Sequence, residues 1–188
     1  MMRNSFIIFI CLASLASCQK VWVEDLQEQA YDTIRGEYKL RMVTWDAPEP
    51  IDIDGDGVAS FDYYQEWNQV YSGGPGYSSV SNKRGRLQVP YVVDSNADWN
   101  GPVNLQRRHM DYVFDIEAVI EGNTSHLKLT PQSSDTQENT DWEVELCGYG
   151  EITLRTDVTL TVLTGPEQTE EVTGHITLYY VRTKYISE

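Results

Sequence analysis

This chain of 188 residues has few of the residues that carry covalent or metal chemistry. Of its three cysteines, Cys11 lies in an apolar N-terminal segment and Cys18 at the end of that segment, which leaves Cys147 for the body of the chain. A single cysteine forms neither an internal disulfide nor a zinc site. We therefore interpret Cys147 as a small strand residue rather than a functional one.

Catalytic motifs are also lacking. His109, His126 and His175 lie far apart, without the His-x-x-x-His or His-x-Glu spacing of metal enzymes, and no glycine-rich phosphate loop follows a strand. Asp115 and Glu117 fall on the polar side of a predicted strand, where a solvated face is a simpler interpretation than a glycosidase pair. Hydrolysis needs a nucleophile, a base and a group that orients them. We therefore predict that the protein is not an enzyme.

Positive charge is scarce. The chain has 14 Lys and Arg against 29 Asp and Glu, which gives a formal net charge of −15. Such a surface repels nucleic acid and anionic lipid, and it favours metal ions or cationic partners. We therefore exclude nucleic acid as a partner.

The N-terminal apolar run, residues 6–15, is too short to span a bilayer. With Arg3 before it and small residues after it, the segment is typical of a secretory signal peptide. It ends in Leu15-Ala16-Ser17-Cys18, which resembles a bacterial lipobox; the alternative is an ordinary signal peptide with a chance cysteine. The resemblance implies that residues 1–17 are removed and that Cys18 is acylated and tethers the protein to a membrane. Gln19 follows in place of aspartate, which favours the outer membrane.

Period-two patterns dominate the rest of the chain. Residues 18–35 predict a tether and a short helix with Leu26, Ala30, Tyr31 and Ile34 at helical spacing. From Gly36 to residue 188 we expect one all-β domain. Alternating apolar residues, taken to face inward, mark its strands: Tyr38, Leu40 and Met42; Met110, Tyr112, Phe114, Ile116, Ala118 and Ile120; Ile152, Leu154, Val158, Leu160 and Val162; Val172, Ile176, Leu178 and Tyr180. Residues 85–94 and 142–150 supply two more strands.

Seven or eight such strands with short turns predict an antiparallel meander that closes into a barrel, with a β-sandwich as the alternative. The order of lipobox, helix, Gly36-Glu37-Tyr38, acidic segment and meander resembles the lipocalin-like lipoproteins of Gram-negative bacteria. Tyr38 stands where lipocalins have the tryptophan of Gly-x-Trp, and the nearest tryptophan is Trp45. The resemblance implies a lipocalin-like barrel of about eight strands, able to bind a ligand.

The segment "DIDGDGVASFDY", residues 52–63, predicts a structural calcium site. An EF-hand loop takes oxygens from its first, third, fifth, seventh and ninth positions, with glycine at the sixth and an acid at the twelfth. The chain offers candidate ligands at nearly all of these positions: Asp52, Asp54, Asp56, the carbonyl of Val58, Ser60, and Asp62, which lies one residue early. Tyr63 occupies the twelfth position. The alternative is a solvated Asp-Gly turn whose side chains cap the next helix.

A helix is expected directly after this loop. Phe61, Tyr64, Trp67 and Tyr71 lie at helical spacing, with Ser60 as the N-cap. The sequence thus predicts one helix after the first strand of the barrel.

Three tryptophans, Trp45, Trp67 and Trp99, flank long loops. Long loops in compact domains are often functional, so these side chains are candidates for a ligand-binding mouth; the alternative is that they plug the end of the barrel. The basic residues Lys83, Arg84 and Arg86 stand out in an acidic chain and suit an anionic partner, unless they form only a solvated loop.

The leading hypothesis is a non-enzymatic outer-membrane lipoprotein with a lipocalin-like barrel and a structural calcium ion. Its expected partner, besides the membrane, is a small hydrophobic ligand in the barrel, or a glycan or envelope protein at the aromatic rim. The alternative is a structural or accessory subunit of a cell-envelope assembly, with a filled barrel and no small-molecule ligand.

Overall fold

A computed structural model describes residues 22–53, 56–69, 78–94, 104–132, 142–165 and 168–186. Residues 22–32 are helical. The elements that follow are β1 (Gly36–Asp46), α2 (Tyr63–Gln69), β2 (Ser78–Val80), β3 (Arg84–Asp94), β4 (Leu105–Glu121), β5 (Thr124–Pro131), β6 (Glu143–Gly148), β7 (Glu151–Gly165) and β8 (Gln168–Lys184). Among these residues, no helix is both long and apolar enough to cross a membrane.

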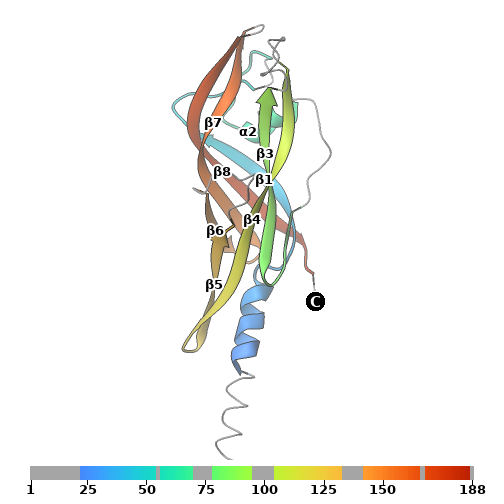
Figure 1. Cartoon of the computed structure of the whole chain (residues 1–188). Helices are drawn as coiled ribbons and strands as arrows, with labels where there is room; N and C mark the ends of the chain where they lie inside the picture. The colour runs from blue at the N-terminus through green and yellow to red at the C-terminus, as the bar shows by residue number, and fades with distance from the viewer. Residues whose placement is uncertain are drawn as a thin grey trace, which may run out of the picture.

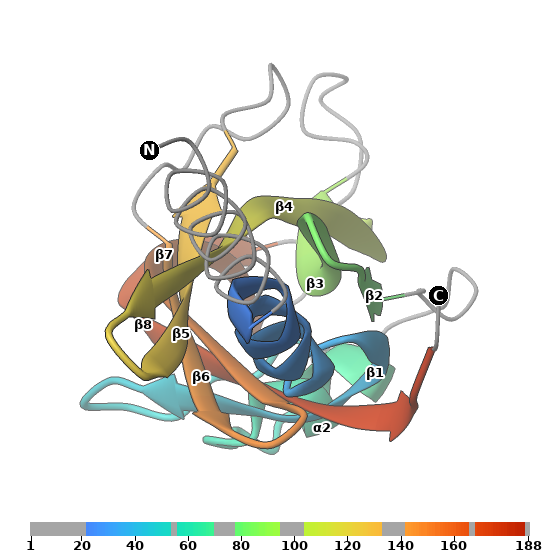
Figure 2. The ribbon, with the colours of Figure 1, turned by 90° about the horizontal axis from the view of Figure 1, so that it is seen from below.

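All eight strands belong to one antiparallel sheet with the order β5-β4-β3-β2-β1-β8-β7-β6. The first strand therefore lies between β2 and the last strand, as in an up-and-down barrel. The sheet curls until its edge strands β5 and β6 come near each other, and Figure 2 shows the strands arranged in a ring. The prediction of an all-β, nearly closed barrel of about eight strands with one helix after the first strand is confirmed, and a two-sheet sandwich is not formed.

Large aromatic side chains lie in the core of the barrel. Tyr112, Phe114 and Tyr180 are at most 2% exposed, and the buried Trp142 ring lies 5.7 Å from that of Tyr112. Phe114 packs directly over Gly85, since a Cβ atom at this glycine would lie 2.0 Å from the ring. The long predicted alternations of β4, β7 and β8 hold, and their apolar positions supply 10 of the 22 buried residues described in this core.

The helix of residues 22–32 lies at one end of the barrel. Figure 1 shows it at the lower end of the molecule beside the β4–β5 hairpin, and Figure 2 shows it within the ring of strands. Its predicted apolar face is confirmed: Ala30 and Ile34 are buried, and the Tyr31 hydroxyl accepts a 3.2 Å hydrogen bond from the main-chain nitrogen of Ala118 in β4. The Tyr38 hydroxyl donates to the carbonyl of Ile34, which joins the helix end to β1.

The predicted inward face of β1 is wrong at Met42, which is 43% exposed. A register shift between Leu40 and Met42 adds one residue to β1 against β8. Such a bulge reverses the side-chain parity of the strand. Val43 and Trp45 therefore point into the core beyond the bulge.

Candidate functional site

The acidic segment forms a closed loop above β1. The main chains of Ile51 and Ser60 exchange hydrogen bonds of 3.0 and 2.8 Å, which join the two ends of the loop. Within it, Asp52 Oδ2 accepts the amide proton of Gly57 at 2.8 Å, and Gly57 has a φ of 85°. That φ lies in the left-handed region, which glycine adopts without strain. The sixth position of the loop is therefore a turn, as the sequence pattern requires.

Asp62 is the N-cap of α2. Its Oδ1 atom accepts hydrogen bonds from the main-chain nitrogens of Tyr64 and Gln65, at 3.0 and 3.1 Å. The predicted N-cap, Ser60, instead accepts from the nitrogen of Asp62 through Oγ at 2.9 Å. An aspartate side chain satisfies the first free N–H groups of a helix at least as well as serine does. The prediction of Ser60 as N-cap is therefore wrong by two residues.

The buried face of α2 also differs from the predicted one. Tyr63 is fully buried and Trp67, four residues later, is 5% exposed, whereas Phe61 is 50% exposed. Phe61 lies before the helix, where its main-chain oxygen accepts from the nitrogen of Trp45. The later helix start leaves Phe61 outside α2, and the helix buries Tyr63 together with the predicted Trp67, four residues apart.

Glu66 is an acidic residue near the loop that the sequence pattern did not reveal. Its side chain is 4% exposed, and Oε2 accepts a 3.2 Å hydrogen bond from the main-chain nitrogen of Ile53. Ionised carboxylates are seldom buried without partners. In the sequence, Glu66 reads as one polar residue of a short helix, and only the fold of the loop over α2 brings it to Ile53.

The metal-site prediction falls partly outside the described residues, because Asp54 lies in their gap. In the described part of the chain, no group of three or more His, Cys, Asp or Glu side chains lies close enough to hold a metal ion. Asp52 and Asp56 take part in loop hydrogen bonds: Asp56 Oδ1 accepts from the nitrogen of Val58 at 2.7 Å. The calcium site stays a prediction.

Two of the three candidate ligand-binding tryptophans are core residues. Trp45 is 3% exposed and its ring nitrogen donates to the carbonyl of Glu49 at 3.0 Å. Trp67 donates to the carbonyl of Tyr91 at 3.2 Å and meets the ring of His109 edge-on. Trp99 lies outside the described residues, as does the predicted lipidation site, Cys18. The role of the tryptophans in ligand binding stays a prediction.

Inside the barrel, the hydroxyl of Tyr112 has no hydrogen-bond partner among the described residues. The side chain is 2% exposed, between the rings of Phe114 at 5.8 Å and Trp142 at 5.7 Å. Burial raises its pKa to about 12. A buried polar group without a partner costs about 1–3 kcal/mol. The Tyr112 hydroxyl is therefore a hydrogen-bonding group among aromatic side chains of the barrel interior.

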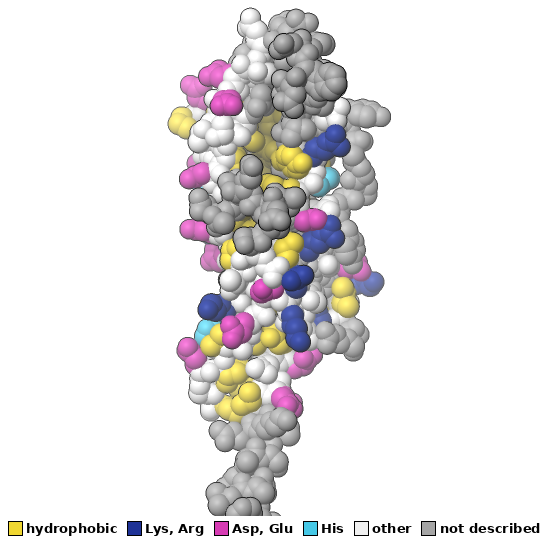
Figure 3. Space-filling model, in the orientation of Figure 1, with side chains coloured by type: hydrophobic (Ala, Val, Ile, Leu, Met, Phe, Trp, Pro, Cys, Tyr) yellow, Lys and Arg dark blue, Asp and Glu magenta, His cyan; other side chains and the backbone are white. Residues whose placement is uncertain are grey.

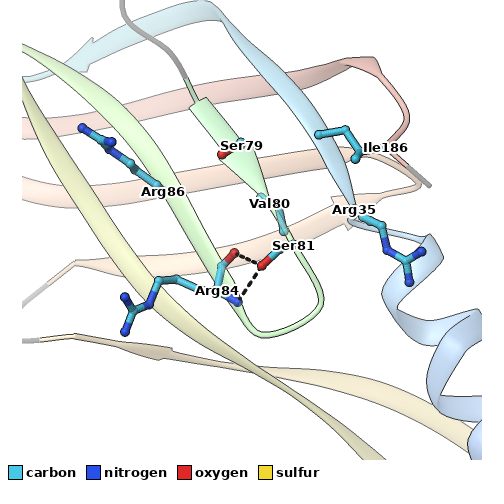
Figure 4. Close-up of a pocket in the computed structure, with 7 residues that line it drawn as sticks. All are labelled: Arg35, Ser79, Val80, Ser81, Arg84, Arg86 and Ile186. Atoms are coloured by element: carbon cyan, nitrogen blue, oxygen red, sulfur yellow. Dashed lines mark hydrogen bonds between the residues drawn. The ribbon is translucent and has the colours of Figure 1, made fainter. Parts of the chain in front are cut away.

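A second site lies on the outer face of the β2–β3 hairpin. It is an open cleft of about 310 Å³, here called the basic cleft. Its lining contains three arginines and no acidic residue: Arg35, Ser79, Val80, Ser81, Arg84, Arg86 and Ile186. Figure 4 shows these residues on the hairpin, on the end of the N-terminal helix and on the C-terminal segment.

The arginines of the cleft differ in exposure. Arg35 is 3% exposed and is held by Glu28 at 2.5 Å and by Asn82 at 2.6 Å. Arg84 and Arg86 are 61% and 53% exposed. Figure 3 shows several Lys and Arg side chains in the middle of the face over β3 and β4, among scattered acidic side chains. The short run Lys83, Arg84 and Arg86 was the sequence signal for this cleft.

Ion pairs link β3 to β4 beside the cleft. Arg86 Nη2 bonds Asp111, and this hydrogen bond lowers the pKa of the Asp111 carboxyl. Arg84 Nε lies 3.7 Å from Asp115 Oδ1. This is an ion pair, but the distance is longer than a hydrogen bond.

The free thiol of Cys147 belongs to neither site. It lies in β6, 2.7 Å from the Thr153 hydroxyl.

Comparisons of the chain with protein-family models, with curated proteins and with solved structures found no match.

Proposed function

We propose that this protein is a lipid-anchored, non-enzymatic binding protein of the bacterial cell envelope, with a lipocalin-like barrel that takes a small hydrophobic ligand. The observation that carries the proposal is the hydroxyl of Tyr112 inside the barrel, between Phe114 and Trp142, which has no hydrogen-bond partner in the described part of the chain. Ligand sites of this kind are mainly apolar, with a few polar groups that fix orientation. A hydrophobic molecule with one hydrogen-bonding group fits this chemistry.

A neutral apolar dye tests the barrel. We expect saturable binding of N-phenyl-1-naphthylamine to the full chain, with energy transfer from tryptophan. Trp142→Phe should reduce the energy transfer, because Trp142 is the described tryptophan next to Tyr112.

Tyr112→Phe tests the hydroxyl. It should leave dye binding intact but weaken the binding of any co-purified natural ligand that bonds the hydroxyl, as identified by native mass spectrometry. Absence of saturable dye binding and of any co-purified ligand contradicts the proposal.

The sequence around Cys18 supports anchoring. We propose that Cys18 is acylated and that the protein resides at the outer membrane. Protein made in a Gram-negative host should carry acyl mass on Cys18 and sediment with outer-membrane fractions. Cys18→Ser should release it, whereas Cys147→Ser serves as the matched control. Membrane association that survives Cys18→Ser, without acyl mass on the wild type, overturns the anchor.

We also propose that the acidic loop binds one calcium ion with a structural role. Three alternating carboxylates repel one another unless a cation lies among them. Asp52, Asp54 and Asp56 are the central ligands of this proposal, and Glu66 is the acid proposed to replace the missing acid at the twelfth position. Its bond to Ile53 N brings it to the start of the loop.

Native mass spectrometry before and after EDTA tests the ion. The expected result is one added calcium mass that is lost with EDTA and with Asp54→Ala. Asp157→Ala, an exposed acid on β7, is the control and should keep the ion. A bare polypeptide mass in every sample, with no uptake from added calcium, excludes the calcium loop.

A second candidate function is an accessory subunit with a filled barrel. The observation that favours it is the hydrogen bond of 2.7 Å between the Tyr180 hydroxyl of β8 and the main-chain oxygen of Gln88 in β3. A side chain that crosses between strands in this way takes up interior space that a ligand would need. Failure of the dye experiment, combined with co-purification of one stoichiometric envelope protein, supports this function instead.

A further inference from the structure

The apolar side of the helix of residues 22–32 continues past the part that the barrel buries. Trp22, Leu26 and Ala30 are spaced four residues apart, so they lie along one side of the helix. Exposure rises along this side with distance from the barrel: Ala30 is 6% exposed, Leu26 is half-buried and Trp22 is 41% exposed. The barrel therefore covers the near part of this side and leaves much of the Trp22 indole uncovered.

The other end of the helix is fixed to the barrel. The main-chain nitrogen of Gly150, in the turn between β6 and β7, donates to the carbonyl of Thr33 at 2.8 Å. Arg182 of β8 donates through Nη1 to the carbonyls of Asp32 and Arg35, at 2.9 and 3.0 Å. Two parts of the barrel thus bind the same helix end, so the helix keeps one direction relative to the strands.

Covalent length limits how far Trp22 can lie from the proposed lipid anchor. Cys18 precedes Trp22 by four residues, and an extended chain spans at most about 3.6 Å per residue. An acylated Cys18 lies at the bilayer surface, so the Cα atom of Trp22 lies within about 14 Å of that surface. Figure 1 shows that the helix begins at the lower end of the molecule and leads from there to the barrel.

The chemistry of Trp22 and its neighbours suits one kind of surface. Tryptophan has a large apolar ring with one N–H donor, and it is enriched where a membrane meets water. Glu24 and Asp25, beside Trp22, are exposed. Anionic lipid headgroups repel such carboxylates, so a surface of zwitterionic headgroups is the better match.

We propose that Trp22 inserts into the headgroup region of the bilayer that holds the acylated Cys18, and that the fixed helix thereby sets the orientation of the barrel on a zwitterionic membrane. This inference rests on the proposed acylation of Cys18. In this orientation the β4–β5 hairpin lies toward the bilayer and the β7–β8 hairpin points away from it, because the two hairpins lie at opposite ends of the molecule (Figure 1).

Fluorescence quenching by brominated lipid tests the contact. The full chain is expressed in a Gram-negative host, purified in detergent with its acyl groups and reconstituted into phosphatidylcholine vesicles. Bromine near the headgroup end of the lipid chains should quench part of the tryptophan emission, and bromine near the methyl end should quench less. Trp22→Phe should abolish this quenching. Trp142→Phe is the matched control and should keep it, because Trp142 is 5% exposed within the barrel.

Lipid charge gives a second readout. At low salt, phosphatidylglycerol in place of phosphatidylcholine should weaken the quenching, because the headgroups repel the acidic residues beside Trp22. Added salt should restore it, since the Debye length falls from about 30 Å at 0.01 M to about 8 Å at 0.15 M. The double variant Glu24→Gln and Asp25→Asn should reduce this dependence on lipid charge and leave the quenching in phosphatidylcholine unchanged.

Energy transfer to a dye on the lipid headgroups tests the orientation. In a Cys147→Ser background, Asn123→Cys places a donor label in the β4–β5 hairpin, and Thr169→Cys places it near the start of β8. Transfer should be strong from the first label and weak from the second. The 17 residues of β8 alone span about 55 Å.

The outcomes separate this inference from the anchor itself. Absence of acyl mass on Cys18, with protein that does not float with vesicles, shows that the anchor and the inference are both wrong. If acylated protein floats with the vesicles but Trp22→Phe leaves the quenching unchanged, or if the two labels transfer equally, the anchor stands and the inference alone is overturned. If Trp22→Ser instead converts a detergent-purified oligomer into a monomer, Trp22 packs against a second copy of the chain, and the membrane contact is again overturned.

Discussion

The hydroxyl of Tyr180 on β8 donates a hydrogen bond of 2.7 Å to the main-chain oxygen of Gln88 on β3. In the described register, β2 pairs with β3 only at Gly85 and Arg86. Beyond these residues β3 stays paired with β4 on one side, and side chains bond its other edge: Tyr63 donates to the carbonyl of Pro90 at 3.4 Å. Unpaired strand edges are a liability that proteins cover with other elements. Tyr180 and Tyr63 of α2 together cover this edge of β3.

Tyr180→Phe should therefore lower the free energy of unfolding by about 1–3 kcal/mol, because it leaves the partly buried Gln88 carbonyl without its donor. Urea denaturation followed by tryptophan fluorescence measures the change. The neighbouring Tyr179→Phe is the matched control, since Tyr179 lies on the other face of β8 and is only partly buried. Equal stability of the two variants would show that the Tyr180 hydrogen bond contributes nothing to the free energy of unfolding.

Alkaline pH should unfold the protein through its buried phenols. Burial raises the pKa of Tyr38, Tyr63 and Tyr180, and it raises that of Tyr112 to about 12. The folded state thus favours the neutral phenol, so this stability is complete below the unfolded pKa of about 10 and is lost as pH rises from there toward 12.

The ultraviolet absorbance of phenolate checks this prediction in the chain of twelve tyrosines. The exposed tyrosines should ionise first and reversibly. The four buried ones should ionise only together with loss of the β-sheet signal in circular dichroism. A single titration of all tyrosines near pH 10, with the sheet intact, contradicts the assignment of these side chains to the core.

Gly85→Ala should destabilise the barrel by about 1–3 kcal/mol or more, because the new methyl group would lie 2.0 Å from the Phe114 ring. Gly148→Ala is the control: its methyl group would meet only the end of the Glu151 side chain, at 3.5 Å. In a Phe114→Leu background, Gly85→Ala should cost much less, and this non-additivity in thermal or urea unfolding distinguishes the ring contact from a general glycine effect.

The sequence predicted best where a strand is long and regular. Tyr112 and Leu154 were assigned inward because β4 and β7 keep a period of two over many residues. Met42 was assigned wrongly because a bulge depends on the partner strand and leaves no mark in the local pattern. Tyr63 was missed because the pattern placed it at the twelfth position of the loop, whereas it is the first residue of α2 and lies on the buried face of that helix.

Tertiary contacts account for what the sequence could not reveal about the sites. The run from Lys83 to Arg86 was visible as a basic cluster, but Ser79, Arg35 and Ile186 join it only through strand pairing and the position of the C-terminal segment. Glu66 reaches Ile53 only because the acidic loop folds over α2. Spacing along the chain carries no information about such pairs.

Asp62 offers a test between its two proposed roles. As N-cap it bonds two main-chain nitrogens of α2, so Asp62→Ala should cost about 0.5–2 kcal/mol of unfolding free energy. Because Oδ1 already accepts both bonds, we expect calcium affinity to change much less than in Asp54→Ala, with Asp62→Asn restoring most of the stability. Urea unfolding and calcium titration on the same variants give both quantities. If Asp62→Asn remains stable but loses calcium as completely as Asp54→Ala, Asp62 is a ligand, and the role proposed for Glu66 as the completing acid loses its support.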